Sequence, residues 1–190
     1  ASPKLGVNTV QEFVAYAKAH PNVTMAHSGP GTLGHLAGIL FGQSANIKLN
    51  FISYRGSGPI ITDLLSGEIN AGFPAYNPAA KNVKILAVAS AKRLDFLPDV
   101  PTMAESGFPT VVAPIWQALV GPANLPPEIV SKLNNLTNAW MNKPALRSQF
   151  SEMGFHLTGG KPSDVTSQVQ DDRLKWTAIL RDNRITLDQN

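Results

Sequence analysis

The chain has 190 residues, of which 43% are hydrophobic and 15% are charged, and its formal net charge is +3. This balance excludes a disordered chain, and no apolar run reaches the roughly eighteen residues that a membrane-spanning helix needs, so we expect no membrane insertion. Lys and Arg occur singly, which argues against a nucleic-acid partner, and the absence of Cys excludes a thiol nucleophile, a thiolate metal site and disulfides.

The N-terminal part of the sequence predicts helices that alternate with strands. Thr9 and Glu12 form a capping box at the start of an expected helix over 9–20. Apolar residues recur at helical spacing from Leu33 onwards and predict a second helix. A third helix has Pro59 in its first turn and Gly67 just beyond its end. The strands expected between and after these helices cover residues 23–27, 47–53, 69–73 and 84–90.

Strands separated by helices favour a mostly parallel α/β sheet. The segment 84–90 contains an unbroken apolar run, which is typical of a strand covered on both faces. Thr102 and Glu105 predict a further capping box that Gly107 closes. A long strand is expected over 111–120 with Trp116 at its centre, and the tryptophans are expected to fill the core.

Helical patterns dominate the sequence from Pro126 onwards. One helix is expected to use Ile129, Leu133, Leu136 and Trp140, another to end at Gly154, and a last one to begin near Ser163. The apolar faces of these helices need a sheet, but the sheet of the preceding residues is already covered by its own helices. We therefore expect a second lobe of which only a part is present.

A glycine-rich turn over Ser28–His35 follows the first expected strand and opens a helix. Ligands of parallel α/β sheets bind where strands end and helices begin, because unpaired N–H groups gather there. Glycines at 29, 31 and 34 let a ligand approach the backbone closely, and Ser28 and Thr32 add hydroxyl groups. The sequence leaves two interpretations open here, an anion-binding turn and a turn that merely requires glycine.

Two further turns are candidates for the same edge of the sheet. Tyr54–Pro59 has the same glycine pattern, although in isolation its sequence favours a plain connection between a strand and a helix. Pro74–Asn77, which includes Ala75 and Tyr76, follows the strand expected to end at Phe73. Because parallel strands end at one edge, we expect all three turns to lie together.

The sequence gives little support for catalysis or for a metal. Ser28 lacks the Gly-x-Ser-x-Gly pattern of a hydrolase nucleophile, and no acidic residue in the turn would orient His35. The four His residues lack metal-ligand spacing. The glycines fit neither the dinucleotide fingerprint nor the phosphate loop. We therefore predict no enzyme activity, no metal and no cofactor.

The ordered segments of this chain resemble one family, the receptor component of tripartite tricarboxylate transporters, also called the Bug family. The resemblance covers essentially all 190 residues. It is carried by residues 9–13, 28–29 with 34–38, 54–59 with 62–67, 86–88, 91–93, 97–102 and 105–107.

The resemblance implies a periplasmic-binding-protein-like fold of class II, with two lobes that close on a small carboxylate. It implies one complete α/β lobe over 1–110, which clamps the ligand. Residues 111–190 would be the crossover strand and C-terminal helices of the first lobe, whose N-terminal part is absent. The implied partners are a small carboxylate and the membrane permease subunits of the transporter. The ligand-binding residues that it implies, in the turns described above, are Ser28, Gly29, Gly31, Thr32, Leu33, His35, Tyr54, Ala75 and Tyr76.

The alternative interpretation is the effector-binding domain of a cytosolic transcription regulator, which can share this two-lobed fold. Residues Ala1–Lys4 do not have the pattern of a signal peptide. We therefore expect either a cytosolic chain or, as the resemblance implies, a periplasmic chain whose leader has been removed.

Overall fold

The computed structural model describes residues 1–78 and 82–185. It divides into two compact units, one formed by Ala1–Ile115 with the chain from Leu180, the other by Trp116–Ile179. The first unit holds a parallel three-stranded sheet in the order β2-β1-β3, which confirms the predicted α/β class. Its strands are β1 (Thr24–His27), β2 (Asn50–Ser53) and β3 (Ala71–Gly72), each shorter than the sequence predicts.

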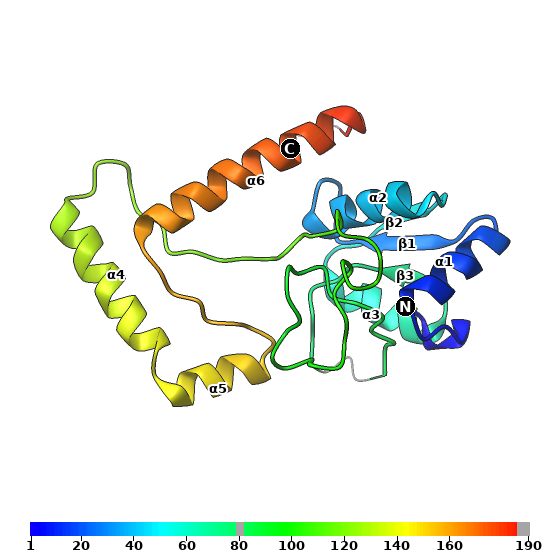
Figure 1. Ribbon diagram of the computed structural model, residues 1–190, viewed down its shortest axis with the longest axis horizontal. Helices are drawn as coiled ribbons and strands as arrows, with labels where there is room; N and C mark the ends of the chain where they lie inside the picture. The colour runs from blue at the N-terminus through cyan, green and yellow to red at the C-terminus, as the bar shows by residue number, and fades with distance from the viewer. Residues whose placement is uncertain (79–81, 186–190) are drawn as a thin grey trace. The chain divides into compact units, whose positions relative to one another are not determined.

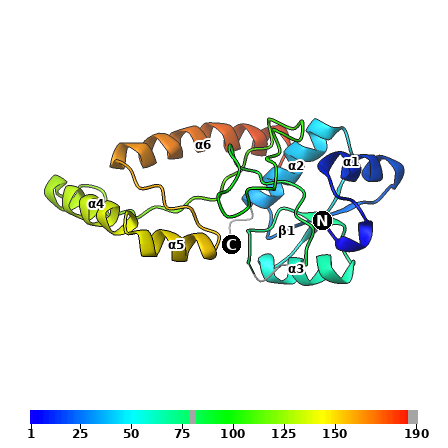
Figure 2. The ribbon, with the colours of Figure 1, turned by 60° about the horizontal axis from the view of Figure 1, so that its bottom comes forward.

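The pleat of the sheet sends neighbouring residues to opposite helical layers. On one face, Met25 and Phe51 lie under α2 (Leu33–Ala45), so close that a Cβ on Gly38 would be 2.8 Å from the Phe51 ring. On the other face, Ala26 joins a buried cluster with Ile60 and Leu64 of α3 (Ser57–Ser66). Figures 1 and 2 show α2 and α3 on opposite sides of the strands.

A further helix, α1 (Val10–Ala19), packs beside α2. The contact is made by the rings of Phe13 and Phe41, whose centroids are 6.0 Å apart. A short 3-10 helix, η1 (Pro3–Leu5), precedes it. The predicted capping of α1 is confirmed: the Thr9 hydroxyl accepts the amide of Glu12 at 3.1 Å.

The C-terminal end of α3 also has the predicted form. Gly67 follows the helix with φ +82°, and its amide donates to the carbonyl oxygens of Asp63 and Leu64. A left-handed residue at this position is favoured when it is glycine.

The strand predicted over 84–90 is wrong. Among the described residues the strand-type pairing of this segment is limited to an isolated bridge, in which the Val88 amide donates to Pro101 and the Met103 amide donates back to Val88. Backbone hydrogen bonds also join Lys84 to Ala1 and Ala89 to Ala113. The segment is half-buried rather than covered on both faces. The segment is therefore held by backbone hydrogen bonds to Ala1 and to the loop over 101–113 and is not a strand of the sheet.

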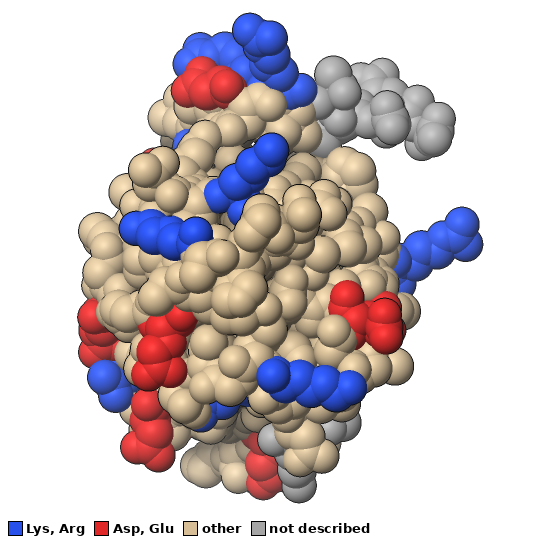
Figure 3. All heavy atoms as spheres, turned by 90° about the vertical axis from the view of Figure 1, so that its right-hand side faces the viewer, with Lys and Arg blue, Asp and Glu red and all other residues tan. Residues whose placement is uncertain are grey.

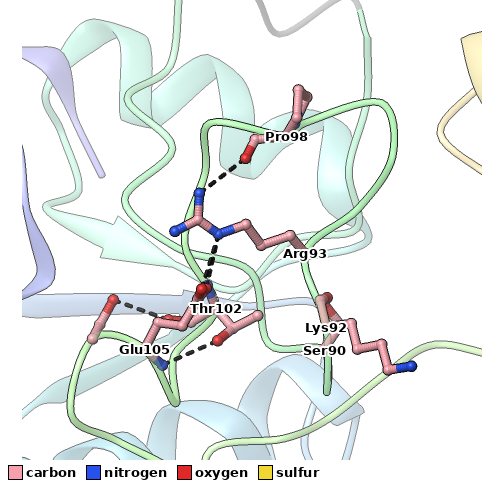
Figure 4. A network of polar contacts seen from close by, with 7 residues as sticks. Ser90, Lys92, Arg93, Pro98, Thr102 and Glu105 are labelled. Atoms are coloured by element: carbon pink, nitrogen blue, oxygen red, sulfur yellow. Dashed lines mark hydrogen bonds and ion pairs between the residues drawn. The ribbon is translucent and has the colours of Figure 1, made fainter.

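The second capping box forms without a helix behind it. The Thr102 amide donates to the Glu105 carboxylate at 2.7 Å and the Glu105 amide donates to the Thr102 hydroxyl at 3.0 Å, but the segment is a series of turns. Arg93 holds the same carboxylate through Nε at 3.0 Å and also donates to the Pro98 carbonyl (Figure 4). The box closes a loop here because Gly107, at φ +90°, ends the segment after one turn.

The strand predicted over 111–120 is also wrong, because no described residue pairs with that segment as a strand. Trp116 is 40% exposed and donates from its indole nitrogen to Asp172 at 2.7 Å, and Trp140 is 41% exposed. The expectation that the tryptophans fill the core is therefore wrong for these two. A strand at 111–120 needs a neighbouring strand, which the described chain does not supply.

The predicted C-terminal helices are confirmed as α4 (Pro127–Met141), α5 (Pro144–Glu152) and α6 (Pro162–Asp182). None of their residues is buried. The Trp140 and Phe150 rings meet edge to face at 5.5 Å between α4 and α5, while Leu136 remains 59% exposed. The apolar faces that the sequence predicts are thus present and only partly covered.

Candidate functional site

The carboxyl ends of the three strands meet at one edge, as predicted. His27 ends β1 beside Ser53 of β2, and Ala26 pairs with Gly72 of β3. The turns that follow these strands are tied together. The Ala75 amide donates to the Ser57 hydroxyl at 3.2 Å. A Cβ on Gly34 would lie 2.4 Å from the Phe73 carbonyl oxygen, so the start of α2 directly abuts the chain after β3.

The bend over 28–32 has a backbone that requires glycine. Gly29 and Gly31 have φ angles of +130° and +71°, a region that residues with a Cβ rarely adopt. The Thr32 hydroxyl and the Thr32 amide both point back to the Gly29 carbonyl, at 2.7 and 3.3 Å. The side chain of Thr32, which is the N-cap residue of α2, therefore does not cap the helix.

This arrangement leaves the start of α2 with free donors. Within the described part of the chain, nothing accepts a hydrogen bond from the amides of Leu33, Gly34 or His35. The residues that carry them are half-buried, and so is Ser28. Unpaired amides in the first turn of a helix, with the positive end of the helix dipole, form a favourable environment for an anion.

Two histidine rings support the bend from within. The Gly29 amide donates to Nδ1 of His27 at 3.2 Å, and the Gly31 amide donates to Nδ1 of His35 at 3.1 Å. The rings stack with their centroids 4.2 Å apart. Burial, and then the neighbouring His27, lower the pKa of His35 below its ordinary value of 6.5. The family resemblance implied a ligand contact for His35, whereas the residues alone favoured a ring that meets the turn or water, and contact with the turn is observed. The sequence did not indicate a role for His27.

The other predicted residues lie at the same edge, and the polar groups of two of them, the Tyr54 hydroxyl and the Ala75 amide, are engaged. The Tyr54 hydroxyl donates to the Asp63 carboxylate at 2.6 Å. Burial, this hydrogen bond and the charges of Asp63 and Glu68 raise the pKa of Tyr54 to about 12. The Ala75 amide is held by Ser57, and the Tyr76 ring lies 5.2 Å from that of Phe96. Among the predicted turns, the Ser28–His35 turn provides three consecutive amides, those of Leu33, Gly34 and His35, for which the described chain supplies no acceptor.

A metal site and a nucleic-acid or membrane partner each set requirements with which the described residues can be compared. Among the described residues, no group of three or more His, Asp or Glu is placed to hold a metal ion. On the face shown in Figure 3, basic side chains are dispersed with acidic ones between them. Within the described ranges, no helix has the length and apolar character of a membrane span.

Comparisons with known proteins identify a single family. The model of the tripartite tricarboxylate transporter family receptor matches residues 1–185. Protein BugT of Bordetella pertussis is 32% identical over 187 residues, which cover 95% of this chain and 57% of BugT. The chain therefore spans little more than half the length of this curated relative.

Solved structures share the fold. Rpa4515 of R. palustris, solved with adipate, is 28% identical with a TM-score of 0.82, over 95% of this chain and 62% of that protein. The periplasmic binding protein BugD is 25% identical with a TM-score of 0.77, over 94% of this chain and 62% of BugD. The fold is thus that of periplasmic binding proteins, as predicted, and the comparisons lend no support to a transcription regulator.

Proposed function

The chain belongs to the tripartite tricarboxylate transporter family of receptors, and from this premise we propose that it captures a small carboxylate in the periplasm for a membrane permease. The observation that carries the proposal is the set of free amides of Leu33, Gly34 and His35 at the start of α2. A carboxylate oxygen placed there accepts charge-assisted hydrogen bonds, and no covalent step is needed. The proposed activity is binding, without catalysis.

The physical demand of this function is modest. A micromolar dissociation constant corresponds to about −8 kcal/mol. Hydrogen bonds to a charged group contribute about 1.5–3 kcal/mol each, so a few amides together with buried apolar contacts supply this amount. Ser28, Gly29, Gly31 and Thr32 would border the carboxylate.

The second part of the proposal concerns the lobes. Residues 1–110 would form the lobe that clamps the ligand, and 111–190 would contribute the crossover segment and helices of the other lobe. Closure of two lobes around a ligand buries it and changes the surface that a permease contacts. Tyr54, Ala75 and Tyr76 would line the same edge through their backbone and ring atoms rather than through free donors.

Adipate is a suitable probe, because Rpa4515 was solved with it and is 28% identical to this chain. The test is a titration of the ¹⁵N-labelled chain with adipate, compared with the uncharged diamide of the same length. We expect adipate to shift the amide resonances of Leu33, Gly34 and His35 and the diamide to leave them in place. Shifts that are absent, or equal for both compounds, would refute amide capture of a carboxylate.

A further inference from the structure

The stacked imidazoles of His27 and His35 are a feature of this edge to which the proposed carboxylate contact assigns no direct role. His27 ends β1 and is 4% exposed, and His35 lies in the first turn of α2. The Phe51 ring of β2 meets both of them edge on, with centroid distances of 6.1 Å to His27 and 5.1 Å to His35. The pair thus joins strand, helix and bend.

We propose that His27 and His35 are positioning residues whose rings hold the Gly29 and Gly31 amides, and that protonation of the His35 ring on acidification releases the Gly31 amide and weakens carboxylate binding at the bend. The inference rests on the proposed function for its second half only. Its first half, the coupling of ring protonation to the bend, concerns this chain alone. Neither ring is placed in contact with the ligand.

The hydrogen bonds fix the state of each ring. A ring nitrogen that accepts an N–H carries no proton, so the Gly29 and Gly31 contacts require Nδ1 to be bare and the proton to sit on Nε2. A second proton can enter only at Nδ1. This proton would make Nδ1 a donor that faces the donor N–H of the glycine. The hydrogen bond would then be lost, and the ring would release the glycine amide.

Releasing these amides changes the bend as a whole. The Gly29 carbonyl accepts the hydroxyl and the amide of Thr32, the residue that immediately precedes the free amides of α2. If the backbone rotates at Gly29 or Gly31, the Gly29 carbonyl no longer holds Thr32 in place. The amides of Leu33, Gly34 and His35, which follow Thr32, then change their direction. The glycines have no Cβ to hold their backbone, so the rings are the restraint.

The surroundings of His35 oppose its charge. From β1 it faces His27, and from β2 it faces the uncharged Phe51 ring. In the described chain, the pKa of His35 is lowered by burial and by His27, with no contribution from a carboxylate that would favour the charged ring. A bound carboxylate would attract a protonated His35, so the direction of the pH effect decides between positioning and simple charge attraction.

The test compares the chain with H35N and H35A. Asn places its side-chain oxygen where Nδ1 stands and does not titrate, whereas Ala removes the acceptor. The ¹⁵N-labelled proteins are followed from about pH 7.5 to about pH 5.5, where histidines titrate, first alone and then with adipate. H35N also corrects for protonation of adipate itself over the same range.

We expect the Gly31 amide of the unmodified chain to follow the His35 titration and that of H35N to stay constant. Because the pKa of His35 lies below 6.5, adipate affinity should fall about two- to fivefold more toward acid in the unmodified chain than in H35N. At about pH 7.5, H35N should bind about tenfold more tightly than H35A, which is rescue by the conservative variant.

Each other outcome is decisive. The positioning role is overturned if the Gly31 amide resonance does not change as the His35 ring is protonated, or if adipate affinity rises toward acid. An amide that follows the ring while affinity does not change overturns the link to binding. An amide that follows the ring in a chain that binds no adipate at any pH supports the restraint of the bend and refutes the proposed function instead.

Discussion

At the scale of single residues, Thr32 determines which donors remain available at the bend. Its hydroxyl donates a hydrogen bond to the Gly29 carbonyl. The side chain of this N-cap residue therefore does not accept a hydrogen bond from a helix amide, as N-cap side chains usually do. Its backbone is extended, with φ −66° and ψ +156°. This conformation is the one that a residue before proline prefers, which allows a single amide to be deleted.

We predict that Leu33→Pro weakens adipate binding by about tenfold or more, because it removes one hydrogen bond to a charged group while proline is well accepted in the first position of a helix. The matched control is Leu33→Ala, which removes the side chain and keeps the amide. Titrations followed by ¹⁵N resonances outside the bend measure both. Equal losses in the two variants would assign the effect to the Leu33 side chain and not to its amide.

Gly34 and Gly58 form a matched pair in the first turns of α2 and α3. A Cβ on Gly34 would be 2.4 Å from the Phe73 carbonyl, whereas a Cβ on Gly58 would meet nothing within 4 Å. We predict that Gly34→Ala lowers the free energy of unfolding by about 1–3 kcal/mol through this overlap. Gly58→Ala should raise it by up to about 1 kcal/mol, because alanine restricts the unfolded chain. Urea unfolding midpoints report both changes, and a stable Gly34→Ala variant would contradict the close packing.

Tyr54 adds a prediction at alkaline pH. Its pKa is raised from 10.0 to about 12 in the folded chain by burial and by Asp63, so the unfolded chain loses this proton first. The stabilisation that Tyr54 provides is complete below pH 10 and is lost as the pH rises through about 12. We expect the unfolding temperature of Tyr54→Phe to fall less steeply with pH in this window than that of the unmodified chain, as measured by thermal unfolding at a series of pH values. An unchanged slope would show that Tyr54 titrates alike in both states.

At the scale of elements, the capping box of α1 offers a clean measurement. Thr9 accepts the Glu12 amide, and the Glu12 carboxylate accepts the Asn8 amide at 2.7 Å. We predict that Thr9→Ala lowers the free energy of unfolding by about 1 kcal/mol, the usual value of an N-cap, and that Thr9→Ser retains most of it. Denaturant unfolding provides the comparison. A Thr9→Ser variant as unstable as Thr9→Ala would point to the lost methyl group instead of the cap.

The elements also show what the sequence can and cannot predict. The capping box at Thr9, the glycine at 67 and the helical spacing from Leu33 act locally, so the helices that they predict are confirmed. The same motif at Thr102 closes a turn, since the residues beyond a cap decide whether a helix continues from it. The strands over 84–90 and 111–120 failed because pairing depends on a neighbour that lies elsewhere in space.

At the candidate site, too, local features were predictable and contacts between distant residues were not. The edge at which the turns meet was predictable from the parallel order of the strands, because parallel strands end together. The glycines at 29 and 31 were informative because only the backbone conformation explains them. The His27–His35 stack and the Tyr54–Asp63 bond were not predictable, since each joins side chains whose orientation depends on the packed fold.

At the scale of the whole molecule, burial is unevenly distributed along the chain. In the described ranges, every buried hydrophobic residue lies between Val7 and Ala113. The helices α4, α5 and α6 have no buried residue, and Leu133, Leu136 and Trp140 of α4 are 42%, 59% and 41% exposed. Helices of this length gain most of their stability from packing of an apolar face, so these should open more readily than the helices on the sheet.

We therefore predict that amide hydrogens of α4 and α5 exchange with solvent well before those of β1 and α2. Local opening needs less free energy where few apolar contacts are lost, and each 1.4 kcal/mol of difference corresponds to about a tenfold change in exchange rate. Mass spectrometry of peptides from exchanged protein measures each element separately, with α1 as the internal reference because Val10, Phe13 and Ala17 are buried. Equal protection of α4 and α1 would mean that the apolar face of α4 is covered in solution, and the prediction would then be wrong.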